Sequence, residues 1–424
     1  MDFKKIKKLD EATVAASKKI KVLSALSWPV GATKKFLKGW NNGNASLPEI
    51  DILPPNIGED IANLDAIVSA CDLKNPVEKF LAETARSYAN AGRMLMSIGT
   101  VDFTKFSMKI YGRPDAKYKM QSFTAVDSAE FFLDITEKLL GHSLMEDTKF
   151  DIPADDFANW MRQKTDEFFS HDKVEVMVDP SISAKALAGA TRIRLRGGVL
   201  FSALDKDQLL FHEAMVHTAT QLNGRKQPNL QSLGLGAPRT TRTQEGIAVL
   251  AELVTNSIDL QRLQRIALRV IAVKMALDGA DFIDLFKFFL EAGQNEVESV
   301  KSAQRVFRGG AVKGGVVFTK DAVYLQGLLE VHSFLRIAIR DNHPQMVSNL
   351  FAGRLTLGDA VRMNELFESG WLNAPTYIPT WASDLKRLAA MMAFSGFVSN
   401  IKLDNISIDR VIALEEEIMI AGGE

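Results

Sequence analysis

The sequence predicts an α+β fold that is predominantly helical and contains one small β-sheet. The chain has 424 residues, of which 46% are hydrophobic, and a chain of this length can bury a sizeable core. Apolar residues recur at helical spacing over much of its length, and the aromatic stripe at residues 282–290 is expected to lie in that core. By contrast, residues 174–178 and 191–199 alternate in the way that favours strands, with a turn-rich segment, 179–189, between them.

Three regions are expected along the chain. Residues 1–150 are predicted to form an N-terminal helical region, which contains a proline-rich linker at residues 47–56. Residues 151–330 hold the predicted sheet and the helix of the candidate site. Residues 331–424 are predicted to form a C-terminal helical region that packs on the second.

The N-terminus is basic and precedes an apolar run at residues 22–32, an order that resembles a signal peptide. However, the run contains Ser24, Ser27 and Pro29, and no clear small-residue cleavage site follows it. We therefore expect an amphipathic helix that leads into the fold. Since no stretch of about 18 or more consecutive apolar residues occurs, no membrane insertion is predicted.

Charge and cysteine content exclude several classes of protein. Lys and Arg total 51 against 52 Asp and Glu, a balance that argues against nucleic acid as a partner. Cys71 is the only cysteine, so the chain has neither an intramolecular disulfide nor a cysteine-based metal site. A reducing cytoplasm is the expected location.

The motif F-H-E-A-M-V-H at residues 211–217 supplies the residue types of a hydrolytic metal site. Zinc is held well by imidazole nitrogen and carboxylate oxygen, and a catalytic site keeps three protein ligands and leaves a fourth position to water. His212, His217 and Glu245 are the candidate ligands of one zinc ion per chain. Glu213 is the candidate general base that takes a proton from the water. This set predicts a metallohydrolase, and a peptidase in particular.

The spacing of the two histidines requires a distorted helix. His212 and His217 are five positions apart, whereas the common zinc motif places its histidines four apart on one helix face. Five residues of a regular α-helix rotate by about 500°, so the two rings would diverge by roughly 140°. A π-type turn widens the repeat and brings the two side chains back together. The sequence therefore predicts a bulge between them.

Local signals place both parts of the motif on helices. Ser202 and Asp205 match the capping-box pattern at the start of the first helix, and Gly224 is a natural stop. A second helix is expected to start near Thr243, with Glu245 in its first turn, where the helix dipole favours a carboxylate. On the simplest alternative, Glu245 only stabilises the charge of that helix end.

The pattern H-E-x-x-x-H at residues 212–217, followed by T-Q-E-G-I-A at 243–248, resembles the QEGLA-motif family. Its bacterial members are called flavohaemoglobin expression-modulating proteins, and its animal members are the microtubule-associated tyrosine carboxypeptidases. Ile247 replaces the usual leucine, a change of similar volume. The resemblance covers nearly the whole chain and includes four further stretches, at residues 99–103, 111–114, 318–327 and 350–357.

The resemblance implies a zincin-like metallopeptidase fold, with the small sheet beside the metal-binding helix, and a zinc-dependent carboxypeptidase activity. It assigns the metal ligands to His212, His217 and Glu245, and the general base to Glu213. The implied partner is the C-terminus of a peptide or protein, and no basic microtubule-binding extension is evident. A non-catalytic zinc-binding regulator, and an endopeptidase or aminopeptidase with the same metal site, are the alternatives.

A carboxypeptidase needs a cation for the terminal carboxylate of its substrate, and the sequence offers two groups of candidates. Arg192, Arg194 and Arg196 alternate along the second predicted strand and share one face, although such a ladder is more often solvated. Residues 193–198 of this strand are also a candidate for pairing with substrate main chain, with an ordinary sheet strand as the alternative. The second group of candidate substrate contacts comprises Arg305, Arg308 and Tyr324.

Overall fold

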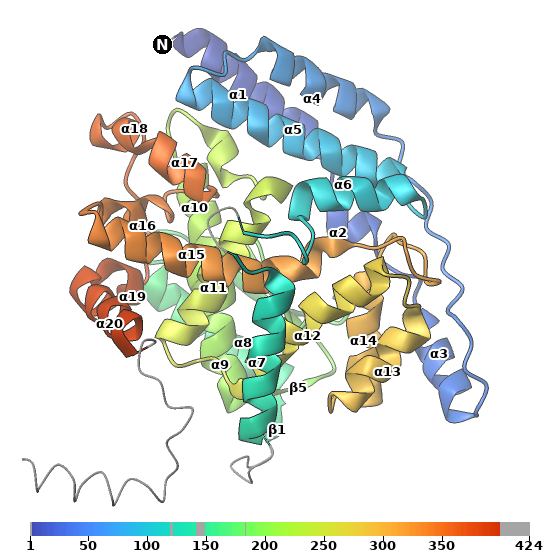
Figure 1. The fold of residues 1–424 in the computed structure, drawn as a ribbon. Helices are drawn as coiled ribbons and strands as arrows, with labels where there is room; N and C mark the ends of the chain where they lie inside the picture. The colour runs from blue at the N-terminus through green and yellow to red at the C-terminus, as the bar shows by residue number, and fades with distance from the viewer. Residues whose placement is uncertain (1, 119–121, 141–148, 183, 399–424) are drawn as a thin grey trace, which may run out of the picture.

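A helical layer formed by the N-terminal part of the chain covers one side of the molecule (Figure 1). The computed structural model describes residues 2–118, 122–140, 149–182 and 184–398. The layer packs as a succession of neighbouring helices. Its members are α1 (Phe3–Ser17), α4 (Gly58–Ala70), α5 (Pro76–Met96) and α6 (Val101–Tyr111).

Local signals fix the start of the longest helix in this layer. Asn75 caps α5 by accepting hydrogen bonds from the N–H groups of Val77 and Glu78, and Pro76 occupies the first helical position. The amphipathic N-terminal helix that the sequence predicted is α1, whereas the apolar run at residues 22–32 forms only the short helix α2 (Val22–Ala25) before α3 (Ala32–Asn41) begins.

Two long helices form the centre of the fold. Helix α11 (Thr241–Val254) crosses α15 (Val323–Arg340), and the largest group of buried side chains runs from the N-terminal layer to both of them. Among the described residues, one helical run, Thr319–Arg340, is long and apolar enough to cross a membrane, but 56% of its most apolar window is buried inside the protein. Burial of this kind is the pattern of a core helix.

A third group of helices packs beside the centre. Helix α12 (Leu260–Leu277) contacts α7 (Ala125–Leu140), α13 (Phe282–Glu291) and α14 (Glu296–Val306). The aromatic stripe of α13 lies in the core as predicted, because Phe282, Leu285, Phe286 and Phe289 are all 0% exposed. Phe36 of α3 packs edge-on against Phe282 and Phe286.

The β-structure is small, as predicted, but contains more strands than the sequence indicated. Strands β2 (Glu175–Asp179) and β4 (Arg192–Arg196) fall on the two predicted segments and pair in parallel. Strand β3 (Ala186–Ala188) pairs antiparallel with β4, giving the order β2-β4-β3. The separate pair β1 (Phe150–Pro153) and β5 (Leu200–Ser202) was not predicted. A second hydrophobic cluster joins this β-structure to α8 (Ala154–Phe168) and to the helix of the candidate site.

The described residues thus form a predominantly helical α+β fold, which confirms the predicted fold class. The remaining elements are α9 (Ala203–Leu209), η1 (Leu210–Thr218), α10 (Ala219–Arg225), η2 (Gln231–Gly234), η3 (Pro238–Thr240), η4 (Thr319–Ala322), α16 (Gln345–Asn349), α17 (Leu357–Arg362), α18 (Asn364–Glu368), α19 (Thr380–Ser383) and α20 (Leu385–Val398).

Candidate metal centre

The motif histidines lie on a π-helix. Element η1 continues α9 and runs into α10, so one long helix contains a π segment from Leu210 to Thr218. The wider turn brings His212 and His217 to the same side, which confirms the distortion that their spacing predicted. Upstream, the predicted capping box is also present: the Ser202 side chain accepts from the Asp205 N–H, and Asp205 accepts from the Ser202 N–H.

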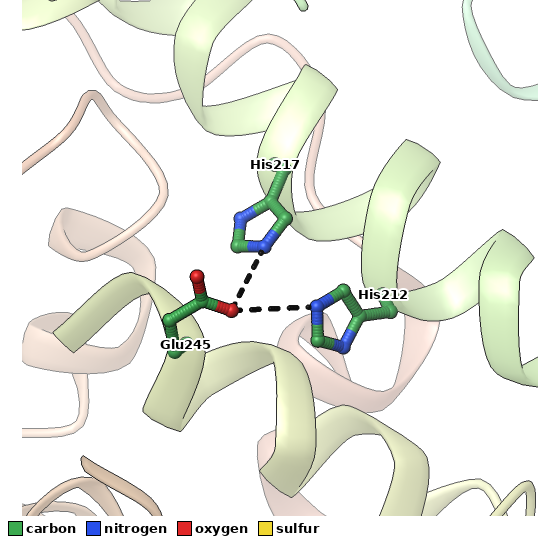
Figure 2. Close-up of side chains that lie close together, drawn as sticks. All are labelled: His212, His217 and Glu245. Carbon is green, nitrogen blue, oxygen red and sulfur yellow. Dashed lines mark ion pairs between the residues drawn. The ribbon is translucent and has the colours of Figure 1, made fainter. Parts of the chain in front are cut away.

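The three candidate ligands converge on one point (Figure 2). Glu245 Oε2 lies 3.5 Å from His212 Nε2 and 3.5 Å from His217 Nε2. One ligand atom from each of the three side chains lies within 4.8 Å of the others. Atoms bound at about 2.0–2.1 Å to a tetrahedral zinc ion lie roughly 3.3–3.4 Å apart. The donor set therefore fits a zinc ion in chemistry, and the two distances from Glu245 to the histidines are close to the spacing that such an ion requires.

Helix α11, which carries Glu245, crosses α15 at unusually close range. The neighbouring Gly246 packs directly on Gly327 of α15, where a β-carbon at Gly246 would lie 2.3 Å from the Gly327 carbonyl carbon. The glycine in the Q-E-G part of the motif thus lets α11 approach α15. The prediction that Glu245 lies in the first turn is wrong, because the 3₁₀ turn η3 leads into a helix that already begins at Thr241.

A buried carboxylate orients the first ligand. Glu252 is 0% exposed, and its Oε1 lies 2.7 Å from His212 Nδ1. A proton on Nδ1 makes this hydrogen bond, so Nε2 is the nitrogen that faces Glu245 and would bind a metal, as in other metal sites where a carboxylate holds the far nitrogen of a histidine ligand. Arg262 of α12 donates to both oxygens of Glu252, at 3.0 and 3.1 Å, and Gln208 also donates to it.

The electrostatics of the site favour a bound positive charge. Burial lowers the pKa of His212, but the carboxylates of Glu245 and Glu252 outweigh it and raise this pKa to about 10. Burial lowers the pKa of His217, which keeps its imidazole neutral, as a ligand must be. Burial would raise the pKa of Glu252, yet Arg262 and His212 bring it down to about 2. A metal cation at this point would meet ionised carboxylates on two sides.

Lys320 holds the other oxygen of Glu245. Its Nζ lies 3.1 Å from Glu245 Oε1 and 3.5 Å from the Tyr324 hydroxyl, and the residue is only 9% exposed. Burial opposes ionisation of Glu245, but the Lys320 ammonium holds the pKa of that carboxyl well below its usual range. Because Lys320 occupies Oε1, only Oε2 of Glu245 faces the two histidines.

Glu213 lies on the sheet side of the histidines. Its Oε2 accepts a hydrogen bond from the N–H of Ala188 in β3, at 3.1 Å. Strand β3 is an edge strand, whereas β4 lies between β2 and β3. The prediction that residues 193–198 pair with substrate is therefore wrong, since both edges of β4 are already occupied.

The arginines of β4 share an outward face, as predicted, while Ile193 and Leu195 between them are 0% exposed. Arg192 pairs with Glu175 at 3.0 Å and Arg194 with Asp179 at 3.2 Å. Arg196 is partly buried, and burial lowers its pKa. A role of these three arginines in substrate binding stays a prediction.

The second group of candidate substrate contacts lies closer to the metal ligands. Arg305 donates to both oxygens of Asp321, and Tyr324 lies beside Lys320. Arg308 is partly buried near Arg305, and its burial lowers its pKa to about 10. Their roles likewise stay predictions.

Sequence reasoning did not identify several residues that surround the site. Glu252 follows Glu245 by seven positions, two turns of the same helix, and this spacing was a usable signal. Lys320 belongs to the second basic cluster and, like Arg354, lies in one of the stretches that resemble the family, but neither position indicated a contact with the motif, because both are distant from it in the sequence. Arg354 Nη2 donates to the main-chain oxygen of His217 at 3.1 Å and so braces the π-helix.

Of three comparisons with known proteins, the match to a protein family is the one that agrees with this chemistry. In fold, the chain is similar to metallocarboxypeptidase 1 of Trypanosoma cruzi, with a TM-score of 0.40 and 13% sequence identity over 92% of this chain and 96% of that one. This likeness is too weak to carry a function across. Curated protein sequences gave no match. Residues 34–400 match the family described as microtubule-associated tyrosine carboxypeptidase, which is most of the chain. The chain therefore belongs to the microtubule-associated tyrosine carboxypeptidase family.

Proposed function

We propose that this protein is a zinc-dependent carboxypeptidase that removes the last residue of a peptide or protein. The observation that carries the proposal is the convergence of His212, His217 and Glu245, with Glu213 beside the first ligand on the same π-helix. The residues would hold one zinc ion per chain. Zinc supplies two effects when bound: it lowers the pKa of a water molecule and polarises the peptide carbonyl.

The protein's own residues have separate tasks in this reaction. Glu213 takes a proton from the attacking water and passes it to the departing amine. The hydrogen bond that Glu213 Oε2 accepts from the Ala188 N–H fixes the orientation of the carboxylate and leaves its other oxygen for the water. Glu252 keeps the Nε2 lone pair of His212 available by holding Nδ1–H.

The edge strand β3 supports a peptide as the substrate. An extended peptide can add to an edge strand through main-chain hydrogen bonds. Because the Ala188 N–H contacts Glu213, a peptide bound along β3 runs past the general base.

The family description names tyrosine and microtubules, so a peptide that ends in tyrosine is the first substrate to test. We also propose a cytoplasmic location, supported by the single cysteine, Cys71, which is partly buried and unpaired.

The test combines metal analysis with peptide cleavage. Mass spectrometry of the wild type should find about one zinc per chain, and His212→Ala, His217→Ala should lose it. Glu213→Gln should retain zinc and lose trimming by about 10²–10⁴-fold. The matched control is Glu59→Gln, since Glu59 is exposed on the outer helix α4 and the same charge is removed.

Peptides with blocked ends identify the type of peptidase. Loss of cleavage when the C-terminus is amidated supports a carboxypeptidase, whereas cleavage inside a doubly blocked peptide identifies an endopeptidase. Zinc binding with no cleavage of any library peptide would favour a non-catalytic regulator. Absence of zinc from all samples would overturn the assignment of the ligands.

A further inference from the structure

Cations accumulate on one side of the metal ligands. Helix α12, helix α14 and the turn η4 pack on one another and carry basic residues toward the same region. Lys320 of η4 contacts Glu245, and Arg305 at the end of α14 contacts Asp321. Arg262 and Arg269 of α12, seven positions apart, lie on one face of that helix. Several positively charged side chains therefore lie in the elements that pack beside Glu245.

Most of these cations already have a fixed anionic partner. Arg262 is held by Glu252 through two hydrogen bonds, at 3.0 and 3.1 Å. Arg305 is held by Asp321 through two hydrogen bonds, one of 2.8 Å. The Lys320 ammonium is held by the metal ligand itself. These three cations are therefore not free to bind the substrate as a new counter-ion.

Arg269 differs from them. Its guanidinium lies over the ring of Tyr324, 5.4 Å from the ring centre, and among the described residues it has neither a hydrogen bond nor an ion pair. The side chain is partly buried, so it keeps an opening to solvent. Burial lowers the pKa of Arg269 to about 9, and the nearby charge of Arg305 adds to this effect. A partly buried cation with no hydrogen bond or ion pair gains stability when an anion binds beside it.

Two other arginines near the site are less suited to this role. Arg354 already donates to the main-chain oxygen of His217. Arg265 lies one turn before Arg269 on α12 and faces the carboxylates of Asp259 and Glu298, which offset its charge. Arg269 has neither a hydrogen bond nor an ion pair among the described residues, and the nearby carboxylate that partly offsets its charge, Asp321, is already held by Arg305 through two hydrogen bonds.

The position of Arg269 matches what an exopeptidase requires. The carboxylate of the last residue lies one residue beyond the scissile bond, about 3.5 Å of extended chain. Lys320, which touches Glu245, lies 5.0 Å from the centre of the same Tyr324 ring that Arg269 covers. Arg269 and the lysine that contacts a metal ligand therefore both lie against the same aromatic side chain.

We propose that Arg269 binds the terminal carboxylate of the peptide substrate and that Tyr324 forms a wall of the pocket for the last residue. This inference rests on the proposed carboxypeptidase function. A guanidinium matches a carboxylate with two parallel N–H···O bonds, which fixes orientation as well as charge. Selection for a free C-terminus follows directly, because an internal segment has no carboxylate at this position.

The test measures peptide binding to a protein that cannot cleave. Zinc-loaded Glu213→Gln protein is titrated with three versions of one tyrosine-ending peptide: the free acid, the C-terminal amide, and an amide with glutamate next to the end. The free acid should bind at least about 30-fold more tightly than the amide, the factor that corresponds to a desolvated charge pair. The glutamate amide should bind no more tightly than the plain amide. If it binds as tightly as the free acid, a carboxylate near the end suffices, and the assignment to the terminal carboxylate is overturned.

Substitution of Arg269 then locates the preference. Adding Arg269→Met should reduce the ratio of acid to amide affinity to within about threefold while zinc content is unchanged, and Arg269→Lys should retain part of the ratio because it keeps the charge. Arg340→Gln is the matched control, since Arg340 has a 71% exposed side chain and pairs with Asp341 at the far end of α15. A full acid preference in the Arg269→Met protein would refute the proposal.

Peptide trimming by the same Arg269 variants, with Glu213 intact, separates the assignment of Arg269 from the proposed carboxypeptidase function. If the wild type trims peptides and Arg269→Met still trims only free acids, the assignment of Arg269 fails and the carboxypeptidase function stands. If the wild type does not trim, the proposed function fails, while an acid preference that depends on Arg269 still identifies a carboxylate site.

Discussion

Replacement of Glu252 by glutamine should weaken both metal binding and folding, by separate routes. The amide can still accept the hydrogen bond from His212 Nδ1, but its NH₂ group would face the guanidinium of Arg262 or the imidazole. Outer carboxylates of this kind typically contribute 10–100-fold, about 1.4–2.7 kcal/mol, to metal affinity. Removal of one member of a buried ion pair costs about 3–5 kcal/mol, because the other charge is left alone.

The surroundings of Glu252 favour the upper part of both ranges, the loss of metal affinity and the loss of folding free energy. Its side chain is 0% exposed, its partner Arg262 is 13% exposed, and three hydrogen bonds reach it from His212 and Arg262. The zinc dissociation constant can be measured by competition with a chromophoric chelator, and the free energy of unfolding by urea denaturation of the same samples. Glu59→Gln serves as the control for loss of one exposed carboxylate.

A double variant separates the two routes. Glu252→Gln combined with Arg262→Met removes the stranded charge, so stability should recover while zinc affinity stays low. Zinc affinity within about twofold of the wild type in Glu252→Gln would refute the claim that this carboxylate orients His212, since the expected loss is at least tenfold.

Two further predictions concern the scaffold. Gly246→Ala places a methyl group 2.3 Å from the Gly327 carbonyl carbon, so it should lower stability by about 1–3 kcal/mol or more and weaken zinc binding. Gly58→Ala, where nothing lies within 4 Å, is the control, and equal melting temperatures of the two variants would contradict this reasoning. Burial opposes ionisation of Asp359, but Arg239 holds its pKa below the usual value. Because the folded pKa is the lower one, this stabilisation is complete above the unfolded value of about 3.9 and is lost as pH falls through the folded pKa. Asp359→Asn should therefore be less stable at pH 7 and lose less stability on acidification. Parallel urea midpoints for mutant and wild type from neutral to acid pH would show that the carboxylate is not the cause.

Features that depend on neighbouring residues alone were predictable. The π-helix follows from the spacing of His212 and His217, because no regular helix can bring both rings to one ion. The capping box at Ser202 was equally local. The start of α11 was placed two residues too late, since the chain enters it through a 3₁₀ turn with no cap side chain.

Features that depend on packing were not predictable. Strand β3 has only three residues, too few to show alternation, and its pairing with β4 defines it. Strands β1, with four residues, and β5, with three, were also too short to be identified from alternation. A longer strand such as β4 carries enough alternating residues for the sequence pattern to identify it.

The chemistry of this protein follows from local sequence: two imidazoles, a carboxylate ligand and an adjacent glutamate, each on a helix that its own residues specify. The charges around these residues depend instead on how the helices pack. Lys320 comes from a segment distant in the sequence from the two motif helices, whereas Arg262 and Arg269 lie on α12, the helix that follows α11. They meet the site because α12 packs on η4, and η4 leads into α15, which crosses α11. The physical reason is that helix geometry depends on residues a few positions apart, whereas the electric field at a buried site is the sum over every element that surrounds it.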